Sequence, residues 1–183
     1  MNYEAQLKTW ILEDKMRVAA LQQVADLFAE LNITDWYIAA GFVRNLVWDK
    51  QHQASFISLN DVDVIYYCTE EISVYRDRLI ELALSERLTL PWSVKNQARM
   101  HEKNNHPAYT STLDAMSYWP EQQTAVAVKL NAKGELEIEA LFGFESLFSL
   151  SVSYNPKADE QVFMERVASK PWFKQYPQLS LAL

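Results

Sequence analysis

The 183-residue chain has three glycines, one cysteine and no long apolar run, and each scarcity excludes a class of protein. So few glycines argue against a β-sandwich, a β-propeller or a Walker-type phosphate loop. The lone Cys68 excludes an intramolecular disulfide and a zinc site built from several thiolates. No stretch approaches the ~18 apolar residues of a membrane helix, and no signal peptide is visible. We therefore expect a cytoplasmic protein with no membrane partner.

Positive charge is also scarce, with 17 Lys and Arg against 24 Asp and Glu and a net charge of −7. An acidic surface repels a phosphate backbone, so we expect no general nucleic-acid binding. Hydrophobic residues make up 49% of the chain, which is too many for a disordered protein. Because no repeat or low-complexity linker divides the sequence, we interpret residues 1–183 as one domain.

Hydrophobic periodicity predicts alternating helices and strands. We expect helices over residues 7–31, 42–48, 72–84 and 112–118, the last capped by Thr112, and from Asn155-Pro156 to about residue 170. We expect strands over residues 36–40, 61–68 and 91–98, followed by a hairpin of 124–130 and 135–141. Residues 49–58 are expected to form a polar loop. This order predicts an α/β or α+β domain in which helices flank a mixed central sheet.

Two aspartates stand at the start of the strand predicted over residues 61–68. Asp61 and Asp63 are two residues apart, so a strand directs both carboxylates to one face. Such a pair is costly beside an apolar strand unless a cation lies between the carboxylates. Mg²⁺ suits that place because it prefers oxygen ligands and shares them with substrate phosphates. Asn60-Asp61 is also typical of an ordinary turn, so the pair alone leaves both interpretations open.

A glycine follows the first predicted strand and opens the next helix. Backbone N–H groups and the helix dipole favour a phosphate at such a junction, so Gly41 is a candidate phosphate ligand. Arg44 lies in the first turn of the same helix, where a cation opposes the dipole and has no evident structural purpose. Arg44 is therefore either an ordinary surface residue or a phosphate ligand.

Three segments carry a resemblance to known proteins: Ala40–Asp49 (AGFVRNLVWD), Asp61–Tyr66 (DVDVIY) and Val94–His101 (VKNQARMH). A strand, a helix opened by glycine and a strand with Asp-x-Asp resemble the nucleotidyltransferase fold of DNA polymerase beta. More closely, the segments resemble a bacterial family of single-domain nucleotidyltransferase-like proteins over most of the chain. The resemblance implies magnesium-dependent transfer of a nucleoside monophosphate from a nucleoside triphosphate to an acceptor hydroxyl, with release of pyrophosphate.

The resemblance also implies roles for the motif residues. Gly41 and Phe42 would form the turn that holds the triphosphate, with Arg44 beside it. Asp61 and Asp63 would be the catalytic residues and would bind one or two Mg²⁺ ions. Phe42 departs from the family pattern, in which the second residue of this turn is small or carries a hydroxyl.

A third carboxylate, which active members of the superfamily carry on a following strand, is not evident. The strand expected over residues 91–98 has Lys95 and Asn96 at its centre. Asn96 could ligate a metal through its carbonyl oxygen, but it cannot deprotonate an acceptor hydroxyl. Glu137 and Glu139 share one face of the later hairpin and are an alternative source, although such glutamates more often line a solvated face.

The locally basic stretch over residues 95–103 supplies further candidates for nucleotide binding. Lys95 and Arg99, with Asn96 between them, could receive phosphates or an anionic acceptor, or the two cations could pair with acidic residues on the surface. Three aromatic residues could stack on a nucleobase or belong to the core: Trp92, Tyr109 and Trp119.

Three functions are compatible with these patterns. The leading interpretation is a magnesium-dependent nucleotidyltransferase. The second is a module that keeps the fold and binds a nucleotide or a metal without transfer, and the third is a protein-interaction module. A carboxylate close to both Asp61 and Asp63 would favour the enzyme, whereas Asn96 alone facing them would favour the binding module. The acceptor, the preferred base and the oligomeric state stay open.

Overall fold

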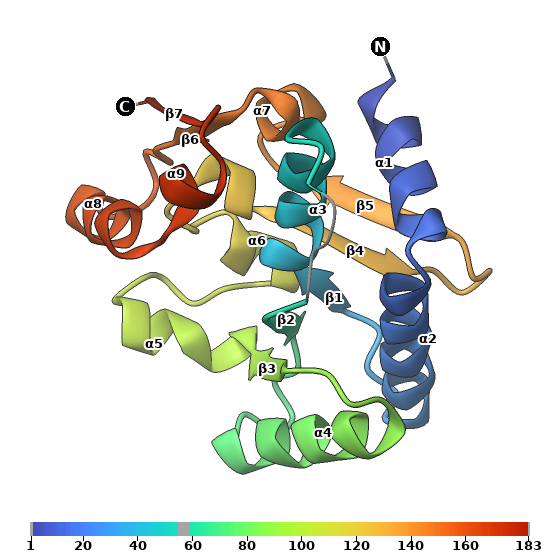
Figure 1. Ribbon diagram of the computed structural model, residues 1–183. Helices are drawn as coiled ribbons and strands as arrows, with labels where there is room; N and C mark the ends of the chain where they lie inside the picture. The colour runs from blue at the N-terminus through green and yellow to red at the C-terminus, as the bar shows by residue number, and fades with distance from the viewer. Residues whose placement is uncertain (1, 55–58, 183) are drawn as a thin grey trace.

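The computed structural model describes residues 2–54 and 59–182 and contains a five-stranded sheet flanked by helices (Figure 1). β2 and β3 are parallel, and the other neighbouring pairs are antiparallel. The spatial order is β3-β2-β1-β4-β5. This arrangement confirms the predicted mixed sheet. Its strands are β1 (Trp36–Ala39), β2 (Val62–Tyr66), β3 (Trp92–Asn96), β4 (Val126–Leu130) and β5 (Leu136–Ala140).

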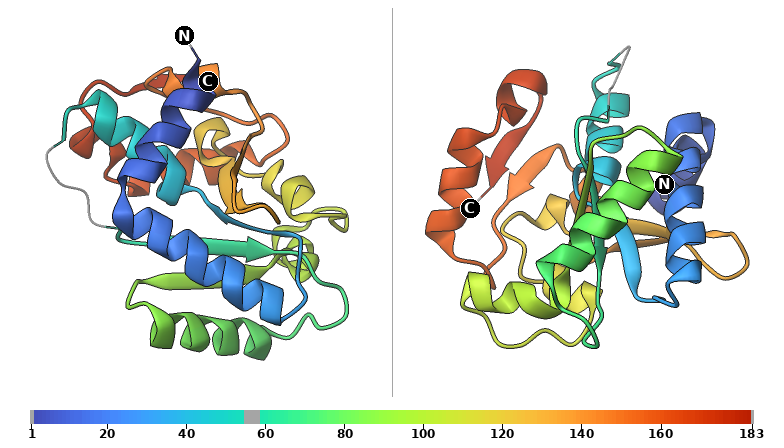
Figure 2. Two further views of the ribbon diagram at one scale, coloured as in Figure 1. Left: turned by 90° about the vertical axis from the view of Figure 1, so that its right-hand side faces the viewer. Right: turned by 90° about the horizontal axis from the view of Figure 1, so that it is seen from below.

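Five helices of the described residues share the main core with one face of the sheet: α1 (Tyr3–Glu13), α2 (Lys15–Glu30), α3 (Gly41–Gln51), α4 (Val74–Arg87) and α7 (Phe144–Phe148). Alternate strand residues such as Ile38, Val64 and Val94 join their apolar side chains in this core. Burying one such side chain contributes about 1.5–3 kcal/mol. The core therefore fixes the start of α3 against β1 and β2. Figure 2 shows the arrangement of helices and sheet from two further directions.

The prediction of a single helix over residues 7–31 is wrong, because two helices meet at Asp14. Asp14 has an extended backbone, and its carboxylate accepts hydrogen bonds from the backbone N–H groups of Met16 and Arg17. It is thus the N-cap of α2. Both helices face the same core, so the apolar period runs across the break and conceals it.

The opposite face of the sheet holds a smaller core and one of the two aspartates. Tyr37, Ala39, Ile65 and Ala127 pack there with residues of α6 (Thr112–Met116). Asp63 lies in register with Ala39 of β1 and Ser93 of β3. Small neighbours on this face leave room beside the Asp63 carboxylate.

Two predicted helix starts are wrong by one to four residues. Ser111, and not Thr112, is the N-cap of α6. The last long helix, α8 (Glu160–Ser169), follows the N-cap Asp159 and does not begin at Asn155-Pro156. The Asn155 side chain is buried and donates to two backbone carbonyls far away in the chain, so it joins segments instead of capping a helix.

The C-terminal segment folds back beside α3 (Figure 1). A third core joins the two parts, because Trp48 of α3 packs against Phe163, Trp172 and Tyr176. The sequence pattern predicted only α8 here. The other elements are α7 (Phe144–Phe148), β6 (Ser151–Ser153), α9 (Trp172–Gln175) and β7 (Ser180–Ala182), with β6 and β7 parallel.

Short helices connect the remaining strands: η1 (Gln97–Arg99), α5 (Met100–Asn104) and η2 (Gln122–Thr124). Of the polar loop predicted over residues 49–58, the first three residues belong to α3, and residues 55–58 lie outside the described part. Within residues 2–54 and 59–182, no helix has the length and apolar character needed to cross a membrane.

Candidate active site

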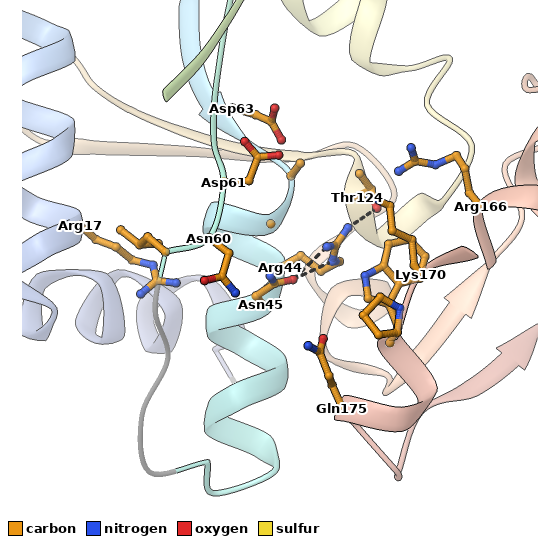
Figure 3. A pocket seen from close by; sticks show the side chains of 15 residues that line it. Arg17, Arg44, Asn45, Asn60, Asp61, Asp63, Thr124, Arg166, Lys170 and Gln175 are labelled. Atoms are coloured by element: carbon orange, nitrogen blue, oxygen red, sulfur yellow. Dashed lines mark hydrogen bonds between the residues drawn. The ribbon is translucent and has the colours of Figure 1, made fainter. Parts of the chain in front are cut away.

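A cavity of about 250 Å³ lies where the start of α3 meets the start of β2 (Figure 3). Asp61 and Asp63 line one side of it. Four cationic side chains from distant parts of the chain line it as well: Arg17, Arg44, Arg166 and Lys170. A cavity with more cations than carboxylates, in a chain of net charge −7, is suited to a polyphosphate.

Burial and the neighbouring charge of Asp61 oppose the ionisation of Asp63. Burial and then the charge of Asp61 raise the pKa of Asp63 to about 6, although a Ser93 hydrogen bond and the charges of Arg44 and Lys170 act in the other direction. Burial likewise raises the pKa of Asp61. A divalent cation would relieve this repulsion, and Mg²⁺ is commonly held by one or two carboxylates together with substrate phosphates. The donor pair therefore fits Mg²⁺.

Arg44 is a buried arginine in the cavity wall, so it is not an ordinary surface residue. Its side chain is 6% exposed, and its guanidinium lies 4.8 Å and 4.7 Å from the ring centroids of Trp48 and Trp172. It donates hydrogen bonds to Thr124 Oγ1 at 2.6 Å and to Asn45 Oδ1 at 2.9 Å.

Arg44 forms no ion pair within the described part of the chain, although the more distant charges of Glu121 and Asp63 act to raise its pKa. The ion pairs found there all involve other cations. Burial lowers the pKa of Arg44 to about 10, so the guanidinium stays protonated at neutral pH. A buried cation without a paired anion is costly, and an anion bound from outside would offset that cost.

Arg17 reaches the same cavity from α2. It is 1% exposed, forms an ion pair with Asp14 and donates from Nε to the Phe42 carbonyl at 2.9 Å. Its Nη2 has no hydrogen-bond partner among the described residues. The Phe42 side chain itself is fully buried in the main core and does not line the cavity. The sequence did contain a signal for Arg17, because it lies four residues before Leu21 on the inward stripe of α2.

The turn that opens α3 has its unusual backbone at Ala40 and not at Gly41–Phe42. Ala40 has φ 55° and ψ −122°, a conformation that residues with a Cβ rarely adopt. A Cβ at Gly41 would lie 3.2 Å from the Asn45 amide and 3.6 Å from the Arg44 guanidinium. Glycine thus leaves room for the Asn45 amide, which accepts a hydrogen bond from Arg44, and α3 has no side-chain N-cap to compete with a phosphate for its first N–H groups.

Replacing Ala40 by glycine is expected to stabilise the protein. Relief of the backbone strain is worth about 1–3 kcal/mol, against an entropic cost of about 0.5–1 kcal/mol for glycine. The melting temperature should rise by roughly 2–4 °C in thermal unfolding. Ala39→Gly, in regular strand backbone one residue earlier, is the control and should lower it. A similar decrease in both variants would contradict the prediction.

Two further cations come from the C-terminal segment. Nothing in the local sequence distinguishes them from ordinary solvent-exposed residues. Arg166 on α8 donates to Glu121 Oε1 at 2.6 Å, and Glu121 is 1% exposed. This pair holds Arg166 at the cavity wall. Lys170 lies just beyond α8, and its charge partly offsets the rise that burial causes in the pKa of Asp61 and of Asp63.

Asn96 and Arg99 lie away from the cavity. Asn96 is in register with Tyr66, which is an odd number of residues from Asp63 and so faces the other side of the sheet. Its amide is bonded to the backbone N–H and carbonyl of Cys68, so the prediction that it could meet the aspartates is wrong. Arg99 forms an ion pair with Asp77. We leave both residues out of the proposed site.

Lys95 is also outside the first cavity. It pairs with Glu81 at 3.4 Å, and it lines a smaller neighbouring cavity on the same sheet face as Asp63.

No third carboxylate from residues 2–54 or 59–182 joins the pair. Ser93 occupies the position on β3 beside Asp63. Glu137 and Glu139 lie on β5, which β1 and β4 separate from β2, and Glu137 pairs with Lys129 at 3.3 Å. Among the residues that the structure describes, no group of three or more His, Cys, Asp or Glu side chains could hold a metal ion.

Comparisons with known proteins agree with this fold. A solved structure described as a CCA-adding enzyme head domain, determined by NMR, is 29% identical, with a TM-score of 0.84 over 97% of this chain and 94% of that chain. A complex of a CCA-adding enzyme with CTP shares the fold at 17% identity and a TM-score of 0.61, over 97% of this chain and 42% of that chain. No curated protein matches the sequence. The profile of a nucleotidyltransferase family matches residues 26–181, so the protein belongs to the nucleotidyltransferase family and has its fold.

Proposed function

We propose that residues 1–183 act as one domain and form a magnesium-dependent nucleotidyltransferase. The enzyme would transfer a nucleoside monophosphate from a nucleoside triphosphate to an acceptor hydroxyl. One observation carries the proposal: two carboxylates that resist ionisation share a cavity with four cations, of which Arg44 lacks a carboxylate partner among the described residues. The family supports the nucleoside triphosphate as substrate.

Some residues of the cavity bind the substrate, and others stabilise the charge that develops during transfer. The N–H groups at Gly41 bind phosphate oxygens, and Arg17, Arg44 and Lys170 neutralise the phosphate charge. Asp61 and Asp63 would hold Mg²⁺, which would supply charge stabilisation for the attacking and leaving oxygens. As the acceptor hydroxyl gives up its proton to water and its oxygen bonds to the α-phosphorus, the bond to the pyrophosphate breaks, and the cations keep the leaving group in place.

The direct test is the binding of ATP, GTP, CTP and UTP by calorimetry, with and without Mg²⁺. We expect magnesium-dependent binding in the wild type and a loss of at least about tenfold in Asp61→Ala, because Mg²⁺ then keeps one carboxylate ligand. Circular dichroism checks that the variant is folded. Glu139→Ala removes a carboxylate from the same sheet face and is expected to bind like the wild type. Wild-type binding in Asp61→Ala would refute the site.

A second function, nucleotide binding without transfer, is favoured by Ser93 in the place beside Asp63. Without a third carboxylate, the site has one group fewer to deprotonate an acceptor. Incubation with an α-phosphate-labelled nucleoside triphosphate and a metabolite extract separates the two functions. Label on an acceptor identifies the transferase, whereas tight nucleotide binding without any labelled product identifies the binding module.

A further inference from the structure

A second cavity of about 230 Å³ adjoins the first at Asp63. The walls of both cavities include Ala40, Asp63, Thr124 and Arg166. Beyond this shared part their chemistry differs, since cations dominate the first cavity. The second adds the cation Lys95, and its remaining side chains are apolar or amides: Ile65, Gln97, Met100, Asn104, Trp119 and Pro120.

We propose that the second cavity binds the nucleobase and ribose of the substrate, with Trp119 stacked on the base. The inference rests on the proposed function, which puts the triphosphate in the first cavity. Each cavity alone is below the ~300 Å³ at which small-molecule sites usually begin, and the two joined exceed it. The reacting α-phosphate then lies at the shared wall beside Asp63, with the phosphates on one side and the nucleoside on the other.

Trp119 has the placement that stacking requires. It is half-buried, packs against the smaller core and lines the second cavity. The other two aromatic candidates line neither cavity. Tyr109 is 4% exposed with its hydroxyl 2.6 Å from His106, and the Trp92 indole donates to the Leu88 carbonyl at 2.8 Å.

Two amides supply polar groups for the edge of a base. Gln97 is 5% exposed, and its Nε2 donates to the Lys95 carbonyl at 3.1 Å, which fixes the orientation of its amide. Asn104 also lines the cavity, from α5. Stacking on an indole combined with hydrogen bonds from amide groups is the usual way in which proteins bind a single unpaired base.

The experiment compares inorganic tripolyphosphate with the tightest-binding of ATP, GTP, CTP and UTP, all with Mg²⁺, by calorimetry. Because a stacked base is worth roughly 5- to 100-fold in affinity, Trp119→Leu should weaken nucleotide binding by that factor and leave tripolyphosphate binding unchanged. Trp119→Phe should keep most of the affinity. Trp92→Leu, which changes a half-buried indole outside both cavities, is the matched control and should bind like the wild type.

A second variant keeps the test decisive if Trp119→Leu is unstable. Met100→Trp fills the second cavity from α5 and should weaken nucleotide binding while sparing tripolyphosphate. Equal losses for both ligands, or no loss for either, would overturn the base site. A wild type that binds tripolyphosphate as tightly as the nucleotide would overturn it too. A wild type that binds neither would refute the proposed function itself.

Discussion

Asp63→Asn is expected to abolish nucleotidyl transfer and, at the same time, to raise the stability of the protein at neutral pH. Loss of one group that stabilises charge in a transition state costs about 10²–10³-fold in rate, and Asp63 is proposed to hold the metal as well, so we expect a loss of at least about 10³-fold. Its pKa of about 6, compared with the ordinary 3.8, corresponds to about 3 kcal/mol of unfavourable free energy when it is ionised.

The gain in stability has a defined pH dependence. Between about pH 4 and 6, folded Asp63 holds a proton that the unfolded chain has released, so the free energy of unfolding falls as the pH rises through this interval. Above pH 6 the whole cost of the buried charge remains. The melting temperature of Asp63→Asn should therefore equal that of the wild type near pH 4 and exceed it most above pH 7.

Thermal unfolding from pH 4 to 8 measures this difference, and added Mg²⁺ should stabilise the wild type more than the variant. Glu86→Gln, which neutralises an exposed carboxylate on α4, is the control and should keep the wild-type pH profile. Parallel profiles for Asp63→Asn and the wild type would show that the carboxylate is not destabilised in the folded protein.

Arg44→Met is expected to weaken the binding of nucleoside triphosphate and of tripolyphosphate by the same factor. A hydrogen bond to a charged group contributes about 1.5–3 kcal/mol, so calorimetry should show a loss of roughly 10- to 100-fold. Methionine has a similar length and fills the space between Trp48 and Trp172, so the packing of the C-terminal segment on α3 should survive.

Arg87→Met is the matched control, because Arg87 is a surface residue whose partner is the exposed Glu30. It should bind both ligands like the wild type. If Arg44→Met is less stable but binds both ligands normally when folded, Arg44 serves only to join α3 to the C-terminal segment. The equal loss expected for the two ligands also separates Arg44 from Trp119, whose replacement should affect only the nucleotide.

The strands and the motifs on them could be predicted because their signals are local. β1 and β2 are short, mainly apolar runs bounded by turn residues, and the hairpin of β4 and β5 turns at Gly134, which has φ +75°. The period of two along a strand also puts Asp61 and Asp63 on one face without any knowledge of the fold. Both line the same cavity.

Helix boundaries were predicted less well, because a helix cap depends on one polar side chain, and the spacing of apolar residues carries no information about it. Asp14 interrupts a continuous apolar stripe, and Asn155 looks like a cap but uses its amide to join distant segments. The position of the strained turn residue, Ala40, also emerged only from the backbone.

The sequence by itself determined the order of the strands along the chain, the carboxylate pair and the glycine at the start of α3. Tertiary structure decided which cations meet that pair. Arg17 and Arg166 lie on helices and Lys170 just beyond one, and they reach the cavity only through the main core and through the packing of the C-terminal segment on Trp48. It also turned Asn96 away from the aspartates, because the face of a strand residue depends on its register with the neighbouring strand, which a local pattern does not specify.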